Sequence, residues 1–421
     1  MVQKKILVIG YTWPEPTTTA AGNRMMQLIE FFQFQNYDIT FASTATKSEY
    51  SIDLSTFNIK TENIVLNDSS FDDFIKKLNP EMVLFDRFLT EEQFGWRVAE
   101  FAPSAIRILD TEDLHSLRQV REKLFKSKIE FTPTKWLQSD ITKREIASMY
   151  RCDLSLIIST YEMDLLLSVV KMDKRLLLHL PFQLNKINNA QITSWPSYNA
   201  RKDFICMGNG KHAPNVDAIV WLKKEIWPLI RKSMPNANLY IYGSYLPEQI
   251  QQMHNAKDGF YVKGWAESVA KVMGQSRINL APLRFGAGIK GKLIDAMQCG
   301  TPSITTAIGA EGMHGELPWN GWITDAAESF ANAAVALYNN ASDWRQSQDN
   351  GIAIINAFYD KASLDKRLSD KIQNLKNVLT AHRETNFLGA LLRHQTLNSS
   401  KYMAKWIEAK NKIKRLRYRS E

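Results

Sequence analysis

The chain has 421 residues, of which 44% are hydrophobic and 23% are charged, and this composition is typical of a soluble globular protein rather than a disordered or fibrous one. No apolar run approaches the roughly 18 residues of a membrane span, and the five apolar or glycine residues after Lys5 are too few for a signal peptide, so we expect a cytoplasmic protein. The formal net charge of +9 comes mostly from the end of the chain, because residues 401–421 alone hold eight Lys or Arg and two Glu. The charge therefore does not indicate that the whole chain binds a polyanion.

Short apolar strands alternate with amphipathic helices in the first half of the chain. Strands are expected at residues 4–10, 37–43, 62–66, 81–86, 105–110 and 153–160, and helices at 24–34 and 70–78. Repeated strand and helix predict a parallel sheet with helices on both faces. In the loop after the first strand, Gly22 lets the backbone approach a ligand closely, or simply serves a strand-to-helix turn.

A second alternating series begins near Asp203. Its expected strands are at residues 202–208, 237–243, 259–264 and 278–283, and its helices at 218–232 and 268–275. The expected divisions are an N-terminal domain at 1–182, a linker at 183–202, a C-terminal domain at 203–375, and helices with a basic tail at 376–421. The fold class is α/β, with two doubly wound Rossmann-like domains that face each other across a ligand-binding cleft.

Residues 284–302, RFGAGIKGKLIDAMQCGTP, combine a glycine-rich loop, two lysines and a short helix. A helix start carries about half a positive charge, so Lys290 and Lys292 are unfavourable there unless an anion lies between them. A diphosphate would reverse the sign of this effect. A tight turn with exposed lysines is the alternative interpretation.

Asp295 lies one turn further along the same helix. Its carboxylate could accept two hydrogen bonds from vicinal hydroxyls such as those of ribose, although a solvated helix carboxylate explains it too. Together the glycine loop, the lysines and Asp295 predict a pocket for a nucleoside diphosphate.

The tail at residues 401–421 carries +6 of the net charge, and its apolar residues, such as Trp406 and Ile413, fall near helical spacing. A basic amphipathic segment of this kind is a candidate for binding an anionic membrane surface, which would make the protein peripheral at the membrane, or for binding RNA. A helix packed on its own protein is the alternative.

Residues 203–315 resemble the donor-binding domain of the GT-B glycosyltransferases, in the large retaining, sugar-nucleotide-dependent group (glycosyl transferases group 1 type). The similarity rests on FICMGNGKHAPNVDAIVWLKKEIWPLIRKSMPNANLYIYG and PLRFGAGIKGKLIDAMQCGTPSITTAIGAEGM. In the N-terminal half it is one of pattern: AAGNR, LDTEDLH, and DLSLIISTYE with its Ser-x-x-Glu. The resemblance implies a GT-B architecture, with the acceptor on the N-terminal side and the donor on the C-terminal side.

The resemblance also implies the donor site. The residues predicted to contact the donor are Arg284, Gly286, Ala287, Gly288, Ile289, Lys290, Asp295, Asn209, Lys211, Glu311 and Gly22. Gly22 is included for its loop position, and Lys211 lies near the family's usual lysine but not at the matching place. Asp295 stands where the family has the second Glu of its E-x7-E motif, which grips the ribose, and Ala287 replaces the first. Asn209 replaces a frequent Arg. These departures leave open whether donor choice changes or activity is lost.

The segment LDTEDLH follows a strand at the expected cleft. Relatives commonly place a His here beside the donor sugar, and the nearest matches are Glu112 and, three residues on, His115. With Lys290 and Asp295 they are the candidate catalytic residues. A satisfied helix cap is the alternative for this segment.

The predicted function is that of a retaining glycosyltransferase of hexosyltransferase type, which moves a sugar from a nucleoside-diphosphate sugar to a hydroxyl of a surface glycan or lipid-linked glycan. No cofactor or metal is predicted, because lysine and the helix dipole already meet the phosphate charge. Three alternatives stay open: an RNA-directed glycosyltransferase, a sugar-nucleotide epimerase of the same fold, and a non-catalytic nucleotide-sugar-binding protein. The three isolated cysteines are expected to be buried free thiols.

Overall fold

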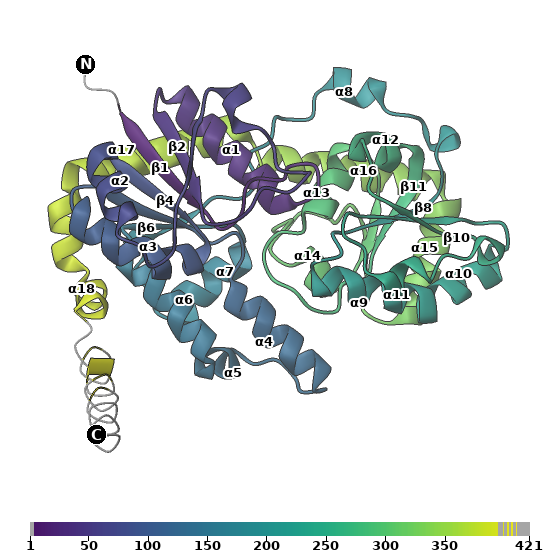
Figure 1. The fold of residues 1–421 in the computed structure, drawn as a ribbon. Helices are drawn as coiled ribbons and strands as arrows, with labels where there is room; N and C mark the ends of the chain where they lie inside the picture. Colours follow the sequence, from purple (N-terminus) through teal and green to yellow (C-terminus); the bar gives the residue numbers. More distant parts are fainter. Residues whose placement is uncertain (1–3, 395–398, 400–401, 404–405, 407–409, 411–421) are drawn as a thin grey trace.

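The computed structural model describes residues 4–394, 399, 402–403, 406 and 410 (Figure 1). It contains two parallel β-sheets, one in each half of the chain, and helices cover both faces of each sheet. This arrangement confirms the predicted α/β class with two doubly wound domains. All three cysteines are buried and unpaired, as expected.

The N-terminal domain has a seven-stranded parallel sheet in the order β3-β2-β1-β4-β5-β6-β7. Its strands are β1 (Lys5–Gly10), β2 (Asp38–Ser43), β3 (Lys60–Asn63), β4 (Met82–Asp86), β5 (Ile106–Asp110), β6 (Leu154–Ile157) and β7 (Leu177–His179). The strand order reverses between β1 and β4, so the connections from these two strands diverge and leave a crevice at their carboxyl ends.

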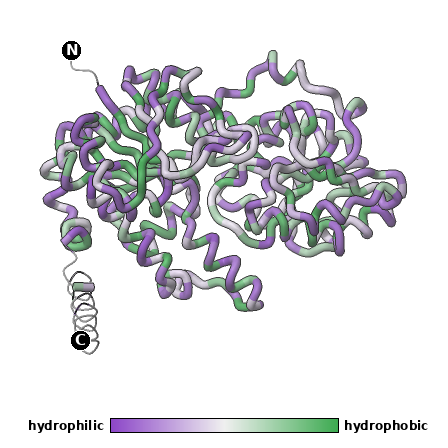
Figure 2. Tube along the Cα trace, viewed as in Figure 1, coloured by the Kyte–Doolittle hydropathy of each residue, from purple (hydrophilic) through white to green (hydrophobic). Residues whose placement is uncertain are grey.

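Helices cover this sheet because its central strands are apolar on both faces. They are α1 (Ala20–Phe34), α2 (Ser70–Leu78), α3 (Arg87–Phe101), α4 (His115–Lys126), α5 (Pro133–Gln138), α6 (Asp140–Arg151) and α7 (Thr160–Asp164). Ile6 and Val8 pack in one core cluster with α1, whereas Leu7 and Ile9 point to the opposite face, in a cluster with α2, α3 and α4. Figure 2 shows the apolar residues gathered along these strands.

The strand expected at 62–66 begins earlier, as β3 at Lys60–Asn63. Val65 and Leu66, which made this segment read as a strand, are 57% and 41% exposed. Polar residues form the strand because it lies at the edge of the sheet, where only backbone pairing with β2 is required.

The C-terminal domain has a six-stranded parallel sheet in the order β10-β9-β8-β11-β12-β13. Its strands are β8 (Lys202–Met207), β9 (Leu239–Tyr242), β10 (Phe260–Gly264), β11 (Ser276–Ala281), β12 (Ser303–Thr305) and β13 (Gly321–Ile323). Its helices are α9 (Ala213–Trp221), α10 (Trp227–Ser233), α11 (Glu248–Gln251), α12 (Val269–Gln275), α13 (Gly291–Gln298), α14 (Ala307–Ala310), α15 (Ala327–Asn339) and α16 (Ala341–Phe358). The order reverses between β8 and β11, which places a second crevice there.

Two segments connect the domains. The expected linker contains α8 (Asn189–Ser194), and at the other end α17 (Lys361–Thr385) and α18 (Phe387–Arg393) return to the N-terminal domain (Figure 1). The apolar face of α17 lies in the same core cluster as Ile6 and Val8. We therefore propose that the C-terminal domain ends near Tyr359 rather than at 375, and the other expected limits stay predictions.

Candidate functional site

A cleft of about 760 Å³ lies between the two domains, where the carboxyl ends of both sheets meet. Its walls come from the loops after β1, β4 and β5 on one side and after β8, β9 and β11 on the other. These loops include both points at which the strand order reverses, so the topology alone accounts for the place of the cleft.

Most of the residues singled out from the sequence meet in this cleft. Its wall includes Gly22, Glu112, His115, Asn209, Lys211, Gly286, Ala287, Ile289, Lys290 and Asp295. Arg284, Gly288 and Glu311 lie outside the wall. The structure therefore brings together parts of the chain that are up to 273 residues apart, from Gly22 to Asp295.

Lys290 is the N-cap residue of α13 and is only 8% exposed. Its ammonium donates a hydrogen bond to the Gly288 carbonyl at 2.8 Å, and burial lowers the pKa of Lys290 to about 8. Burial likewise lowers the pKa of Lys292 to about 8, and its ammonium donates to Asn215 Oδ1 at 2.6 Å. The buried ammonium of Lys290 and the part-buried ammonium of Lys292, at one helix start, make a corner of the cleft that attracts anions.

Gly288 shapes the loop that leads into this helix. Its φ of +66° is a conformation that favours glycine, and a Cβ there would lie 2.8 Å from the Cβ of Asp113. The loop therefore packs directly against the N-terminal domain.

Asp295 lies in the cleft wall one turn after Lys290. Its carboxylate has no hydrogen-bond partner among the residues that the structure describes, and burial raises the pKa of Asp295 to about 7. A half-buried acceptor of this kind is suited to a ligand hydroxyl.

Asn209 and Lys211 follow β8 on the same side of the cleft. Asn209 Oδ1 accepts a hydrogen bond from the Lys211 backbone at 2.8 Å, and its Nδ2 donates across the cleft to the Thr18 carbonyl at 3.3 Å. The Lys211 ammonium lies 3.4 Å from the centre of the Tyr245 ring. Asn209 thus joins the two walls, and Lys211 is held over an aromatic face.

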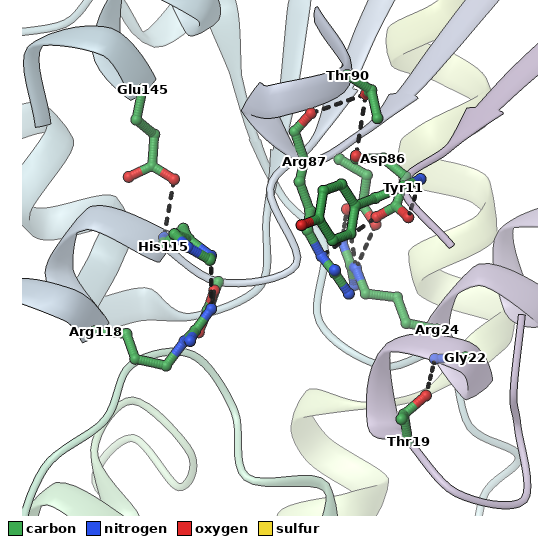
Figure 3. A network of polar contacts seen from close by, with 12 residues as sticks. Tyr11, Thr19, Gly22, Arg24, Asp86, Arg87, Thr90, His115, Arg118 and Glu145 are labelled. Atoms are coloured by element: carbon green, nitrogen blue, oxygen red, sulfur yellow. Dashed lines mark hydrogen bonds and ion pairs between the residues drawn. The ribbon is translucent and has the colours of Figure 1, made fainter. Parts of the chain in front are cut away.

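Gly22 belongs to the opposite wall, in the first turn of α1. A Cβ at this position would lie 2.4 Å from the Glu15 carbonyl carbon, so no larger residue fits. Its N–H donates to the capping Thr19 hydroxyl at 2.9 Å, as Figure 3 shows. The glycine therefore serves the packing of its own loop, although it also borders the cleft.

Glu112 has a φ of +63°, which is uncommon for a side chain of this size. Its Oε1 is buried without a hydrogen-bond partner. Burial, together with the nearby charges of Asp110 and Asp86, raises the pKa of Glu112 well above its usual value. A strained, unpaired carboxyl in a cleft is a candidate to contact a substrate.

His115 is fixed by its neighbours (Figure 3). Its Nδ1 lies 2.6 Å from an Arg118 nitrogen, and its backbone N–H donates to Glu145 Oε1 at 2.9 Å. Burial and the Arg118 charge lower the pKa of His115 to about 4, so the ring is neutral at pH 7.

Several residues of the N-terminal wall were not found from the sequence. Arg87, with a φ of +69°, places its guanidinium 5.0 Å from the centre of the Tyr11 ring and 3.7 Å from Asp86 Oδ1 (Figure 3). Beneath them, the fully buried Arg24 donates to both carboxylate oxygens of Asp110. The sequence does contain a sign of this acidic wall, because the strand segments EMVLFD and AIRILD each end in Asp, at the sheet edge where ligands bind.

Arg284 and Glu311 are engaged elsewhere. The Arg284 guanidinium donates to both carboxylate oxygens of Asp217, at 2.9 and 2.6 Å, and lies over the Trp221 and Phe125 rings. Glu311 pairs with Arg121 at 2.7 and 2.8 Å. Neither side chain faces the cleft directly.

Metal sites, membrane helices and the basic tail were also considered from the sequence. The part of the chain that the structure describes holds no group of three or more His, Cys, Asp or Glu arranged for a metal ion. None of the described helices is long and apolar enough to cross a bilayer. The predicted basic tail at 401–421 lies outside the described residues, apart from positions 402, 403, 406 and 410.

Comparison with curated sequences gives a partial match. Residues 201–340 match the family model Glycosyl transferases group 1. An uncharacterized 44.6 kDa protein in the cps region of Klebsiella pneumoniae is 25% identical over 166 residues, which are 37% of this chain and 42% of that protein. The chain thus spans about two fifths of the length of this relative.

Comparison with solved structures covers most of the chain. Sucrose-phosphate synthase from Thermosynechococcus elongatus gives a TM-score of 0.66 at 17% identity, over 89% of this chain and 99% of that one. Anabaena HepE in complex with UDP-glucose gives 0.65 at 11% identity, over 88% and 100%. A mutant of S. aureus TarM in complex with fondaparinux, alpha-GlcNAc-glycerol and UDP gives 0.65 at 10% identity, over 89% and 100%. Residues 201–340 are therefore similar to the Glycosyl transferases group 1 family, within a chain that has the GT-B fold.

Proposed function

We propose that the protein is a glycosyltransferase that moves a sugar from a nucleoside-diphosphate sugar to a hydroxyl acceptor, with retention of the anomeric configuration. The observation that carries the proposal is the environment of Lys290, a buried ammonium at the start of a helix that lines the cleft. Such an arrangement is unfavourable by itself and becomes favourable once a diphosphate binds.

The other residues of this wall fit the remaining parts of a sugar nucleotide. Asp295 offers an unpaired carboxylate to the ribose hydroxyls, one helical turn from the phosphate corner. The cleft volume of about 760 Å³ is within the range of ligand pockets. UDP is the first nucleotide to test, since the HepE and TarM structures hold UDP or UDP-glucose.

The chemistry then follows from the charges. As the bond between sugar and phosphate breaks, negative charge grows on the diphosphate, and Lys290 with the N-terminus of α13 stabilises it. The leaving phosphate oxygen accepts the proton of the acceptor hydroxyl. Under this proposal no protein base and no metal are required.

A sugar-nucleotide epimerase is the second candidate, and a specific observation favours it. Asp86, Glu112 and Asp113 bring three carboxyl groups to the N-terminal wall, where they could move protons. Consumption of the sugar nucleotide without any acceptor, with recovery of an isomeric sugar nucleotide, would support this alternative over transfer.

We also propose that the C-terminal end binds an anionic lipid surface, which would suit a lipid-linked or surface glycan as acceptor. Helix α18 exposes Phe387, Leu388 and Leu391, and Trp406 in the tail is 58% exposed. Exposed apolar side chains, followed in the sequence by the +6 charge of residues 401–421, supply the apolar and the electrostatic attraction of an interfacial segment. Co-sedimentation should occur with phosphatidylglycerol vesicles and not with phosphatidylcholine ones; binding to RNA alone would favour the RNA-directed alternative.

Thermal unfolding tests the donor site. Wild type, Lys290→Ala and a control, Lys232→Ala, are heated with UDP, GDP, ADP and their sugar derivatives; Lys232 is an exposed lysine at the end of α10, away from the cleft. A ligand at a hundredfold its dissociation constant should stabilise wild type and the control by about 2.7 kcal/mol, and Lys290→Ala far less. Failure of every nucleotide to stabilise wild type would overturn the proposal.

A further inference from the structure

Two buried ionisable side chains of the N-terminal domain contact the glycine loop of the C-terminal domain. They are Arg121, on α4, and Glu162, on α7, which are 6% and 0% exposed. Figure 1 shows both helices on the side of the N-terminal domain that faces α14. The loop proposed to hold the donor diphosphate is therefore supported partly from outside its own domain.

Arg121 reaches the first glycine of the loop. Its Nη1 donates to the Gly286 carbonyl at 2.9 Å and to Glu311 Oε2 at 2.7 Å, and its Nη2 donates to Glu311 Oε1 at 2.8 Å. The guanidinium also lies 4.9 Å from the centre of each of two rings, Phe131 and Tyr161. A bidentate pair and two aromatic rings thus fix the guanidinium plane, while its Nε is buried without a hydrogen-bond partner.

This contact orients the peptide that follows Gly286. In a planar trans peptide the carbonyl and the next N–H point in opposite directions, so a carbonyl held toward Arg121 turns the Ala287 N–H away from it. Ala287 borders the cleft, and its N–H has no hydrogen-bond partner within the described part of the chain. Arg121 therefore sets the direction of an unpaired N–H donor in a residue that borders the cleft.

Glu162 holds the other end of the loop. Its Oε1 accepts hydrogen bonds from the Gly288 N–H at 2.8 Å and from the Leu114 N–H at 3.0 Å, while Oε2 is buried without a partner. Burial raises the pKa of Glu162 to about 8, and a proton on Oε2 would leave both accepted bonds in place. One carboxyl thus ties the loop to the segment that carries Glu112.

Burying the Arg121 charge and the Glu162 carboxyl group is expensive, and nonpolar residues could fill the same volume at lower cost. We propose that Arg121 and Glu162 are positioning residues that give the glycine loop its donor-binding shape only when the two domains are closed on each other. The inference rests on the proposed donor site. If Arg121 and Glu162 act in this way, closure of the cleft raises the affinity for the nucleotide, and binding of the nucleotide favours closure to the same extent.

The test compares four variants of the full chain. Arg121→Gln and Glu162→Ala remove the contacts, and Glu162→Gln keeps an oxygen acceptor at the same place. The control is Arg151→Gln, because Arg151 also makes a bidentate pair, with Glu91, but within the N-terminal domain and away from the loop. Each variant is measured for UDP affinity by calorimetry and, without ligand, for amide hydrogen exchange in peptides covering 284–292.

Arg121→Gln and Glu162→Ala should weaken UDP binding about tenfold, a change of about 1.4 kcal/mol, and should speed exchange in the loop. Glu162→Gln should stay near wild type in both measurements. Arg151→Gln should lower the melting temperature and change neither UDP affinity nor the exchange rate of the loop. If Arg121→Gln affects only the melting temperature, as Arg151→Gln does, its role is structural and the proposal falls.

The two readouts separate this inference from the proposed function. Wild type that binds no nucleotide refutes the donor site, whereas the exchange rates of the free chain still decide whether Arg121 and Glu162 order the loop. If Arg121→Gln does not fold, Arg121→Lys replaces it, because lysine keeps the charge but cannot pair with Glu311 through two nitrogens. Hydrogen exchange and UDP affinity are then compared in the same way.

Discussion

The two walls of the cleft differ in how they are built and in the charges they carry. The C-terminal wall takes its main features from one continuous segment, 284–295, and presents Lys290 and Lys292 at a helix start. The N-terminal wall collects residues from the ends of three strands, and there carboxylates alternate with arginines. The first wall suits a diphosphate and the second suits hydroxyl groups, so changes on the two walls should impair different steps.

The largest effect should come from Lys290→Met. Loss of the ammonium should weaken UDP binding by about a hundredfold, or roughly 2.7 kcal/mol. The free variant should nevertheless be more stable at pH 7, because lowering the lysine pKa from 10.5 to about 8 disfavours the charged form by roughly 3 kcal/mol at most. Calorimetry and denaturant unfolding measure the two changes.

Opposite signs for stability and affinity would distinguish a binding residue from a structural one. If Lys290→Met both destabilises the free chain and leaves UDP binding intact, the hydrogen bond of Lys290 to the Gly288 carbonyl is its main role, and the contrast between the walls disappears.

On the N-terminal wall, Glu112→Gln should leave UDP affinity within about twofold and lower the transfer rate by about tenfold. The reason is that the charges acting on the Glu112 carboxyl come from the N-terminal domain, one of its oxygens is unpaired, and one hydrogen bond to a reacting group is worth about 1.5 kcal/mol. Steady-state kinetics at saturating donor, with the melting temperature as control, measure this split. Equal losses in affinity and rate would place Glu112 in the donor site instead.

The same contrast explains which parts of the site could be predicted from sequence. Lys290 and Asp295 were found because a glycine loop, a helix start and an acid one turn later are neighbours in the chain. Arg121 was not found, since its partners Gly286 and Glu311 are 165 and 190 residues away and nothing local marks it.

For the fold, apolar periodicity predicted the central strands, which are buried on both faces. It failed at the edge strand β3, where four polar residues, KTEN, are all exposed and burial gives no pattern. It also could not show that α17 leaves the second domain for the first, because an amphipathic helix does not specify which core it covers. The roles of the site residues stay predictions.

A pH series should sharpen the assignment of the C-terminal wall with a smaller effect. Under the proposed function, binding of UDP-glucose needs an ionised Asp295, whose pKa burial raises to about 7, and a protonated Lys290, whose pKa burial lowers to about 8. Affinity should therefore be highest between about pH 7 and 8 and fall several-fold one pH unit outside this window. Calorimetry on wild type and Asp295→Asn across this pH range tests the assignment. In Asp295→Asn, affinity should no longer fall at low pH but should still fall at high pH.

The smallest effect on nucleotide binding is expected for Arg284→Ala, although Arg284 stands beside the glycine loop in sequence. Its guanidinium is paired with Asp217 and lies over two aromatic rings, on the side of the loop away from the cleft. The partly exposed pair is worth about 1 kcal/mol, so Arg284→Ala and Asp217→Ala should lower the unfolding free energy by similar amounts while UDP affinity changes less than about twofold. A tenfold weaker affinity in Arg284→Ala alone would mean that the guanidinium leaves Asp217 for the diphosphate when the donor binds. In that case the C-terminal wall of the free protein is one cation short of its donor-bound form.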